Sequence, residues 1–301
     1  MSTRILKITA ALLLIGLCLL ACKAQQADPT PAPAGTPEPS AAPEIAEIVI
    51  ETQTAAPAPT VPPTPTPSPT PEPTEPPTPT PTPKPLEGVV IGIDPGHQRV
   101  YNPNPEPVAP GSSQTKQKVA GGCRGVKSGV YEYEVVQSVG LYLKTLLEEQ
   151  GATVCITHET IDVDISNIER AEFFNEHNVD LGIRLHCNKS DDKKVKGAFM
   201  LIPSERRTKF YEFNLRAAKT VLEEYLKETG LSMRYRDGIT ERADQTGFNW
   251  CKRPVINIEM GHLSNPEEDA LLSTDAFQQK MAQGLCNGIV RFFTEERAGK
   301  Q

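Results

Sequence analysis

The chain has 301 residues and a formal net charge of −7, from 31 basic and 38 acidic side chains. This balance lacks the basic footprint of a nucleic-acid-binding protein, so we expect no nucleic-acid partner. Of the 29 prolines, 21 fall between Pro29 and Pro85. Residues 87–301 are therefore expected to form one domain, long enough to bury a sizeable core.

Residues 1–22 have the pattern of an export signal. Two basic residues precede an apolar run from Ile8 to Ala21, which is short for a membrane-spanning helix. The run ends in Leu-Leu-Ala-Cys, which resembles the signal of bacterial lipoproteins, and the resemblance implies a lipid on Cys22. We therefore expect an extracytoplasmic protein anchored to the outer face of the bacterial cytoplasmic membrane through Cys22.

Residues 23–86 consist mainly of proline, threonine, alanine and serine, and from Val61 onward Pro and Thr almost alternate. Such a segment cannot bury a core, and its prolines favour an extended polyproline II conformation. At about 3.1 Å per residue, the stretch 61–85 alone would reach roughly 80 Å. We expect a disordered linker that holds the following domain away from the membrane.

The domain is predicted to open with a strand that ends at a histidine. The run VVIGID, from Val89 to Asp94, is typical of a strand covered on both faces. Pro95 and Gly96 then turn the chain, so His97 follows the strand's carboxyl end, where open α/β sheets bind ligands. Residues 99–127 are polar and rich in Pro, Gly and Ser, which predicts a long loop near His97.

The remaining residues predict strands that alternate with helices. From Glu132, apolar side chains recur at helical spacing until Gly151. The run DLGIRLHCN alternates, so Arg184, His186 and Asn188 share its polar face. Further strands are expected at 152–157, 197–202 and 254–260, further helices at 167–177, 206–229, 266–272 and 275–295, and a polar connection at 230–253. The pattern predicts an α/β fold: a single domain with a mostly parallel sheet flanked by helices on both faces.

Two histidines and two glutamates are expected at the ends of these elements: His97, Glu132, His186 and Glu259. Two histidines, one glutamate and an open position suit a catalytic Zn²⁺. A further glutamate beside such a metal can take a proton from its bound water, and the pair can hydrolyse amides. Glu259 lies in an otherwise apolar strand, where a carboxylate needs a cation, a metal or a catalytic task. The spacing alone does not establish the site, because the four residues lie far apart in the sequence and no HExxH helix is present.

Four separated motifs occur in an order that resembles a known family. The sequence DPGH, the helix opening at Glu132, then RLHCN and PVINIEMGHLSN resemble the zinc-dependent N-acetylmuramoyl-L-alanine amidases of amidase type three, from about Val89 to Phe293. The resemblance implies a peptidoglycan hydrolase with Zn²⁺ on His97, Glu132 and His186, and with Glu259 as the catalytic carboxylate. It also implies a twisted sheet wrapped by helices. In this family the substrate is the amide bond between N-acetylmuramic acid and L-alanine.

Several polar residues outside the four-residue site have expected roles of their own. Cys187 replaces the family's usual alanine, and His262 replaces its usual phenylalanine, so we expect packing or substrate contact from His262 and no metal ligation. Arg184 is expected either to bind substrate or to form a salt bridge. Asn188 is expected to orient His186, to bind substrate or merely to close a turn. His158 and His177 are expected at the surface.

The cysteines outside the export segment number five and show no CxxC spacing, which argues against a disulfide framework and a cysteine zinc site. Cys155, Cys187 and Cys286 are expected as small core residues. Cys123 and Cys251 fall in predicted loops, and a single bridge between them is left open.

Two other functions stay open. The first is a zinc metallopeptidase, which would hydrolyse a peptide bond within the stem peptide and not the bond between N-acetylmuramic acid and L-alanine. The other is a metal-free, catalytically inactive protein that binds the wall. The presence of all four motif residues favours the amidase, with peptidoglycan as its partner and a monomer as its expected state.

Overall fold

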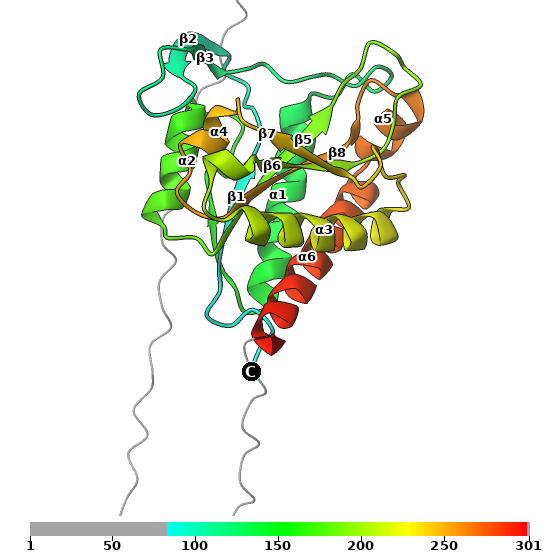
Figure 1. Ribbon diagram of the computed structural model, residues 1–301. Helices are drawn as coiled ribbons and strands as arrows, with labels where there is room; N and C mark the ends of the chain where they lie inside the picture. Colours follow the sequence, from blue (N-terminus) through cyan, green and yellow to red (C-terminus); the bar gives the residue numbers. More distant parts are fainter. Residues whose placement is uncertain (1–82, 300–301) are drawn as a thin grey trace, which may run out of the picture. The chain divides into compact units, whose positions relative to one another are not determined.

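A six-stranded sheet forms the centre of the computed structural model, which describes residues 83–299. The strands are β1 (Val90–Pro95), β4 (Thr153–Ile156), β5 (Leu181–Asn188), β6 (Phe199–Pro203), β7 (Ile239–Arg242) and β8 (Val255–His262). They lie in the order β4-β1-β5-β8-β6-β7, and every neighbouring pair is parallel except β6 and β8 (Figure 1). The predictions for residues 1–22 and for most of the linker, Cys22 included, lie outside the described residues.

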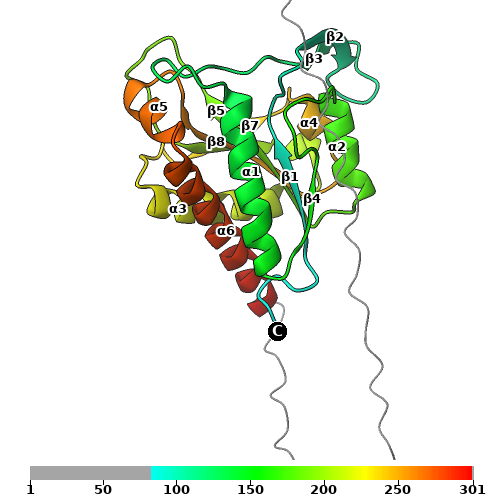
Figure 2. The same cartoon turned by 180° about the vertical axis from the view of Figure 1, so that it is seen from behind.

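Helices cover both faces of this sheet. One face carries α1 (Glu132–Glu149), α3 (Tyr211–Thr229) and α6 (Asp275–Ala298), and the other carries α2 (Asn167–Glu176) and the short α4 (Thr246–Asn249) (Figure 2). A further helix, α5 (Pro266–Leu272), follows β8. The predicted α/β fold, with a mostly parallel sheet between two helical layers, is confirmed. None of the helices within residues 83–299 has the length and apolar character that crossing a membrane requires.

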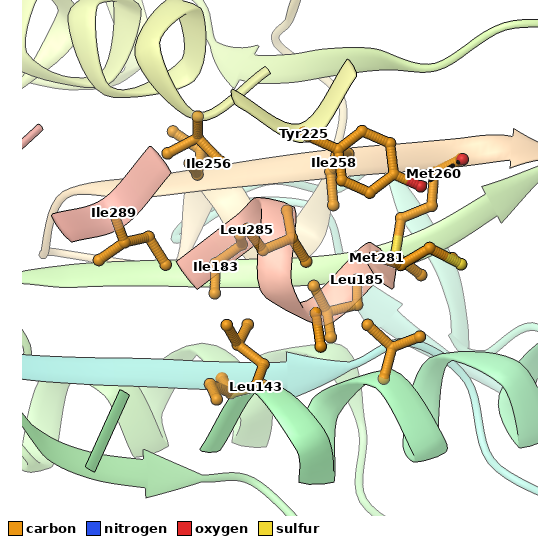
Figure 3. Close-up of a cluster of buried hydrophobic side chains, with 14 of the residues drawn as sticks. Leu143, Ile183, Leu185, Tyr225, Ile256, Ile258, Met260, Met281, Leu285 and Ile289 are labelled. Carbon is orange, nitrogen blue, oxygen red and sulfur yellow. Dashed lines mark hydrogen bonds between the residues drawn. The ribbon is translucent and has the colours of Figure 1, made fainter. Parts of the chain in front are cut away.

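The larger core lies between the sheet and the layer of α1, α3 and α6. Figure 3 shows Ile183 and Leu185 of β5 and Ile258 of β8 facing side chains of these helices, such as Leu143. All are fully buried. The opposite side chains of β5, at 184 and 186, therefore face the other layer, as the alternation of this strand predicts.

Two segments predicted as polar loops contain regular structure. The hairpin of β2 (Asn102–Pro107) and β3 (Thr115–Val119) lies within residues 99–127, and β7 and α4 lie within residues 230–253. Most hairpin side chains are exposed, and β2 contains prolines, so neither strand shows the apolar alternation that marks a half-buried strand. The prediction of an irregular loop is therefore wrong, because the segment contains a β-hairpin. Its predicted position beside His97 is correct.

The domain also begins slightly before residue 87. Leu86 is completely buried in the larger core, and its backbone N–H donates to the carbonyl of Gln150 at 2.9 Å. Arg297 at the end of α6 donates to the carbonyl oxygens of Pro85 and Glu87. Leu86 is thus the first core residue, where we had expected the end of the linker.

A buried ion-pair cluster holds the end of β1. Asp94 is fully buried and accepts hydrogen bonds from Arg170 Nη1 at 2.6 Å and from Arg184 Nε at 2.7 Å. Arg170, from α2, also donates to the carbonyl oxygens of Pro95 at 2.7 Å and His97 at 2.9 Å. Burial alone would raise the pKa of Asp94, but the two guanidinium groups hold this pKa well below its usual range. The cluster therefore fixes the turn that carries His97.

Replacing the central carboxylate should destabilise the fold. Asp94→Asn leaves two buried guanidinium groups without a counter-charge, so we expect the free energy of unfolding at pH 7 to fall by about 3–5 kcal/mol. Because folding lowers the pKa of Asp94, the ionised carboxylate stabilises the wild type above about pH 4, and this stabilisation is lost as the pH falls further. Urea unfolding at several pH values should show the difference between the two proteins shrinking in acid.

A matched control is Asp162→Asn. Asp162 pairs with Arg99 at 3.1 Å, and both side chains are more than half exposed. Removing this surface pair should cost less than about 1 kcal/mol. Equal losses in the two variants would contradict a special role for the buried cluster.

Candidate functional site

A cleft lies at the carboxyl ends of β1, β5 and β8. We call its two adjoining cavities the first cavity, of about 270 Å³, and the central cavity, of about 390 Å³. Both are lined by His97, Gln117, Ala120, His186 and Glu259. Gln117 belongs to β3, so the hairpin that the sequence did not reveal forms one wall of the cleft.

His97 is fixed by its backbone and by its own ring. Its φ is +64°, a left-handed conformation that is uncommon outside glycine and that recurs at functional sites. The ring Nδ1 lies 2.8 Å from the carbonyl oxygen of Ala120 and donates to it, which turns Nε2 toward the Glu132 carboxylate. Gly96 is required beside it, because a Cβ there would lie 2.2 Å from the His186 ring.

Glu132 is the first residue of α1, and its carboxylate lies inside the protein. Oε2 accepts the backbone N–H of Cys123 at 2.8 Å, and Oε1 accepts that of Cys187 at 3.0 Å. Burial alone would raise the pKa of Glu132, but the nearby His97 and hydrogen bonds with both imidazoles hold it well below its usual range. Glu132 is therefore ionised, rigid and directed at the two histidines.

The three side chains converge on one point. Glu132 Oε1 lies 3.1 Å from His97 Nε2 and 3.2 Å from His186 Nδ1, and the two nitrogens lie 3.2 Å apart. Ligand atoms at about 2.0–2.1 Å from a tetrahedral Zn²⁺ lie roughly 3.3 Å from one another, so the observed triangle fits this ion. Burial lowers the pKa of His186, which favours the neutral imidazole that a metal needs. These residues can hold a metal ion with one side open to the cleft.

Glu259 lies beside this group without joining it. Its Cα pairs with that of His186 across β5 and β8, and its carboxylate lines both cavities. Asn257 Nδ2 lies 3.5 Å from Glu259 Oε1. Burial, and secondarily the charge of Glu132, raise the pKa of Glu259 to about 8. A cation on the three ligand atoms would lower this pKa, which places the carboxyl group within reach of proton transfer near neutral pH.

The three residues considered as possible substrate contacts, Arg184, Asn188 and His262, lie in different surroundings. Arg184 forms the expected salt bridge, with Asp94, and also lines the first cavity. Asn188 lines the central cavity. Substrate contact by these two residues stays a prediction. His262 is 1% exposed, and its ring packs 6.3 Å from that of Phe199, so it takes the packing role.

The histidines outside the cleft are only partly as expected. His177 is exposed, as predicted, whereas His158 is buried, so its predicted surface position is wrong. His158 Nδ1 lies 2.9 Å from Thr157 Oγ1, and burial lowers the pKa of His158 to about 4. The ring is therefore neutral and acts as a packed core residue.

The cysteines are free thiols in the described residues, including Cys123 and Cys251, for which a bridge was left open. Cys123 is buried next to Glu132, whereas Cys251 packs against the smaller core on the α2 face. Cys187 and Cys286 are core residues as predicted, and Cys155 is only partly buried.

Sequence reasoning missed Arg170 and the cleft wall. Arg170 shares the buried face of α2 with Phe174, four residues on, and a basic residue on an apolar helical face is the signal that it needed a buried partner. The hairpin offered no comparable signal, because its residues are polar and exposed.

Comparisons with known proteins identify the family of this chain. A family model described as N-acetylmuramoyl-L-alanine amidase matches residues 91–291. The chain is 28% identical over 228 residues to the germination-specific N-acetylmuramoyl-L-alanine amidase of Bacillus subtilis (strain 168), covering 70% of this chain and 82% of that protein. It is 25% identical over 230 residues to an N-acetylmuramoyl-L-alanine amidase of Mycobacterium tuberculosis, covering 70% and 89%.

Solved structures show the same fold. The N-acetylmuramyl-L-alanine amidase Ami1 of Mycobacterium smegmatis superposes with a TM-score of 0.64 at 20% identity, over 72% of this chain and 99% of that one. The apo form of Ami1 from Mycobacterium abscessus gives a TM-score of 0.63 at 23% identity, over 69% and 99%. Since the family model covers two thirds of the sequence, the chain belongs to the N-acetylmuramoyl-L-alanine amidase family, type three.

Proposed function

We propose that this protein is a zinc-dependent peptidoglycan hydrolase that cleaves the amide bond between the lactyl group of N-acetylmuramic acid and the L-alanine of the stem peptide. The observation that carries the proposal is the triangle of His97 Nε2, Glu132 Oε1 and His186 Nδ1, 3.1–3.2 Å on each side, with Glu259 beside it. Family membership and the names of the relatives support the choice of bond.

His97, Glu132 and His186 are assigned as the protein ligands of the zinc ion. When bound, the zinc would supply a Lewis acid that lowers the pKa of a water molecule and polarises a carbonyl group. The protein's contribution is to hold the ligand atoms of these three side chains in place. The carbonyl of Ala120 orients the His97 ring, and the N–H groups of Cys123 and Cys187 orient the Glu132 carboxylate.

Glu259 is assigned as the proton-transfer group. Its carboxylate accepts a proton from the attacking water as the water oxygen bonds to the amide carbon. The same proton then passes to the amide nitrogen, so that the carbon–nitrogen bond breaks and L-alanine leaves as an amine. The raised pKa of Glu259 supports this role, because the group must hold the proton between the two steps.

The proposed location follows from residues outside the described part of the chain. Residues 1–22 and Cys22 would attach the protein to the outer face of the cytoplasmic membrane, and the Pro/Thr-rich residues that follow would let the domain reach into the cell wall. We propose a monomer at that place.

The first test separates metal binding from proton transfer. Glu259→Gln keeps the side chain's size and removes its proton acceptor, so we expect zinc content near one per chain and turnover lower by about 10²–10⁴-fold. His186→Ala removes a ligand and should lose both the zinc and the activity. Elemental analysis and a peptidoglycan-release assay measure the two quantities, and loss of zinc from Glu259→Gln would sink the assignment.

The second test identifies the bond. Digestion of purified sacculi should free the amino group of L-alanine in proportion to the peptide released and leave glycan strands without peptides. Labelling of new amino termini followed by mass spectrometry detects this. New termini within the stem peptide would instead support the metallopeptidase, and a zinc-free protein that releases nothing would support the inactive wall-binding protein.

A further inference from the structure

A third cavity, which we call the cationic cavity, opens beside the central one. Its volume is about 380 Å³, within the usual range of ligand sites. It shares Gly121, Gly122, Cys123 and Lys189 with the central cavity. A ligand held at Glu259 and the three metal-binding residues can therefore extend into it. The rest of its lining is Arg124, Tyr131, Ser190, Asp191, Lys193 and Ser264.

The lining of this cavity carries an excess of positive charge. Arg124, Lys189 and Lys193 are basic, and Asp191 is its one acidic residue. Among the described residues, neither Lys189 nor Lys193 takes part in an ion pair. Both ammonium groups are thus available to an anionic ligand.

The backbone that presents these lysines is tied down. The N–H of Ser190 donates to Ser264 Oγ at 2.8 Å, and Asn265 Nδ2 donates to the carbonyl of Lys193 at 2.9 Å. The guanidinium of Arg124, which also lines the cavity, lies 4.8 Å from the centre of the Tyr131 ring and donates to the carbonyl of Gly129. The backbone that carries these basic side chains is therefore held in place by hydrogen bonds within the protein.

The first cavity, which shares no lining residue with the cationic cavity, is lined by different kinds of side chain. It is lined largely by neutral polar side chains: Gln117, Asn167, Gln245, Thr246 and Asn257. Its two longer basic side chains are both held in ion pairs, Lys116 with Asp244 at 3.0 Å and Arg184 with Asp94 at 2.7 Å. Each of these carboxylates also pairs with a second basic side chain, Arg242 and Arg170 respectively. The two cavities thus differ in how their basic side chains are held: those of the first are fixed in ion pairs, whereas Lys189 and Lys193 of the cationic cavity are in none of the ion pairs of the described residues.

The substrate has the matching asymmetry. On the sugar side, the lactyl carboxyl group is consumed in the scissile amide, which leaves neutral hydroxyl and acetamido groups. On the peptide side, the γ-linked glutamate and the carboxyl terminus supply carboxylates. We propose that the cationic cavity binds the carboxylates of the stem peptide through Lys189, Lys193 and Arg124, and that the sugar side occupies the first cavity. This inference rests on the proposed amidase function.

The test uses two disaccharide tripeptides, ending in L-alanyl-D-γ-glutamyl-L-lysine, that differ only in whether both peptide carboxylates are free or amidated. The zinc-loaded wild type should show a higher kcat/KM for the free acid, and 0.5 M salt should weaken this preference. The double variant Lys189→Gln/Lys193→Gln should lose about five- to tenfold in kcat/KM on the free acid, mainly through KM, and change little on the amide. Its preference between the two substrates should approach one.

The matched control is Lys219→Gln/Lys280→Gln, which removes the same charge from exposed positions on α3 and α6 that line none of the three cavities. It should keep the wild-type preference. A wild type that cleaves both substrates equally, or a cavity variant that loses activity equally on both, overturns the carboxylate site alone. A zinc-loaded wild type that cleaves neither substrate overturns the amidase function, and the inference with it.

Discussion

The buried carboxylate of Asp94 sets the geometry of the catalytic end of the domain. Its single negative charge has no solvent contact and is shared by two guanidinium groups, those of Arg170 from α2 and Arg184 from β5. Because Arg170 also holds the carbonyl groups of Pro95 and His97, charge balance in the interior is coupled to the position of a proposed zinc ligand. Loss of any member of this cluster would therefore disturb stability and site geometry together.

A second constraint comes from Glu132, which links three segments distant in sequence. Its carboxylate receives N–H groups from the loop at Cys123 and from β5 at Cys187, and its Oε1 faces His97 and His186. Ordering these dipoles before any ligand arrives removes part of the reorganisation that metal binding would otherwise require. The position of Glu132 at the start of α1 explains why a single residue can reach both strands.

Strands and helices could be predicted from the sequence where burial of one face gives the apolar residues a regular spacing. The alternation of β5 correctly assigned its two faces, and the helix from Glu132 was found from its apolar stripe. The convergence of the four site residues needed the family resemblance, because spacing does not encode distances between strand ends. The β2–β3 hairpin was missed, since exposed strands with prolines follow no apolar pattern, and the burial of His158 depends on neighbours from other elements.

The contact between the two ends of the described chain has a consequence for how the domain is held. Arg297 donates hydrogen bonds to the carbonyl oxygens of Pro85 and Glu87, close to the first residue of β1. The cleft lies at the other end of this strand, beyond its last residue. Figure 1 shows the C-terminal end of α6 at one pole of the domain and the β2–β3 hairpin, whose Gln117 lines the cleft, at the opposite pole. The described chain therefore enters the domain at the end remote from the cleft, so a ligand can approach the cleft without meeting the residues at Pro85.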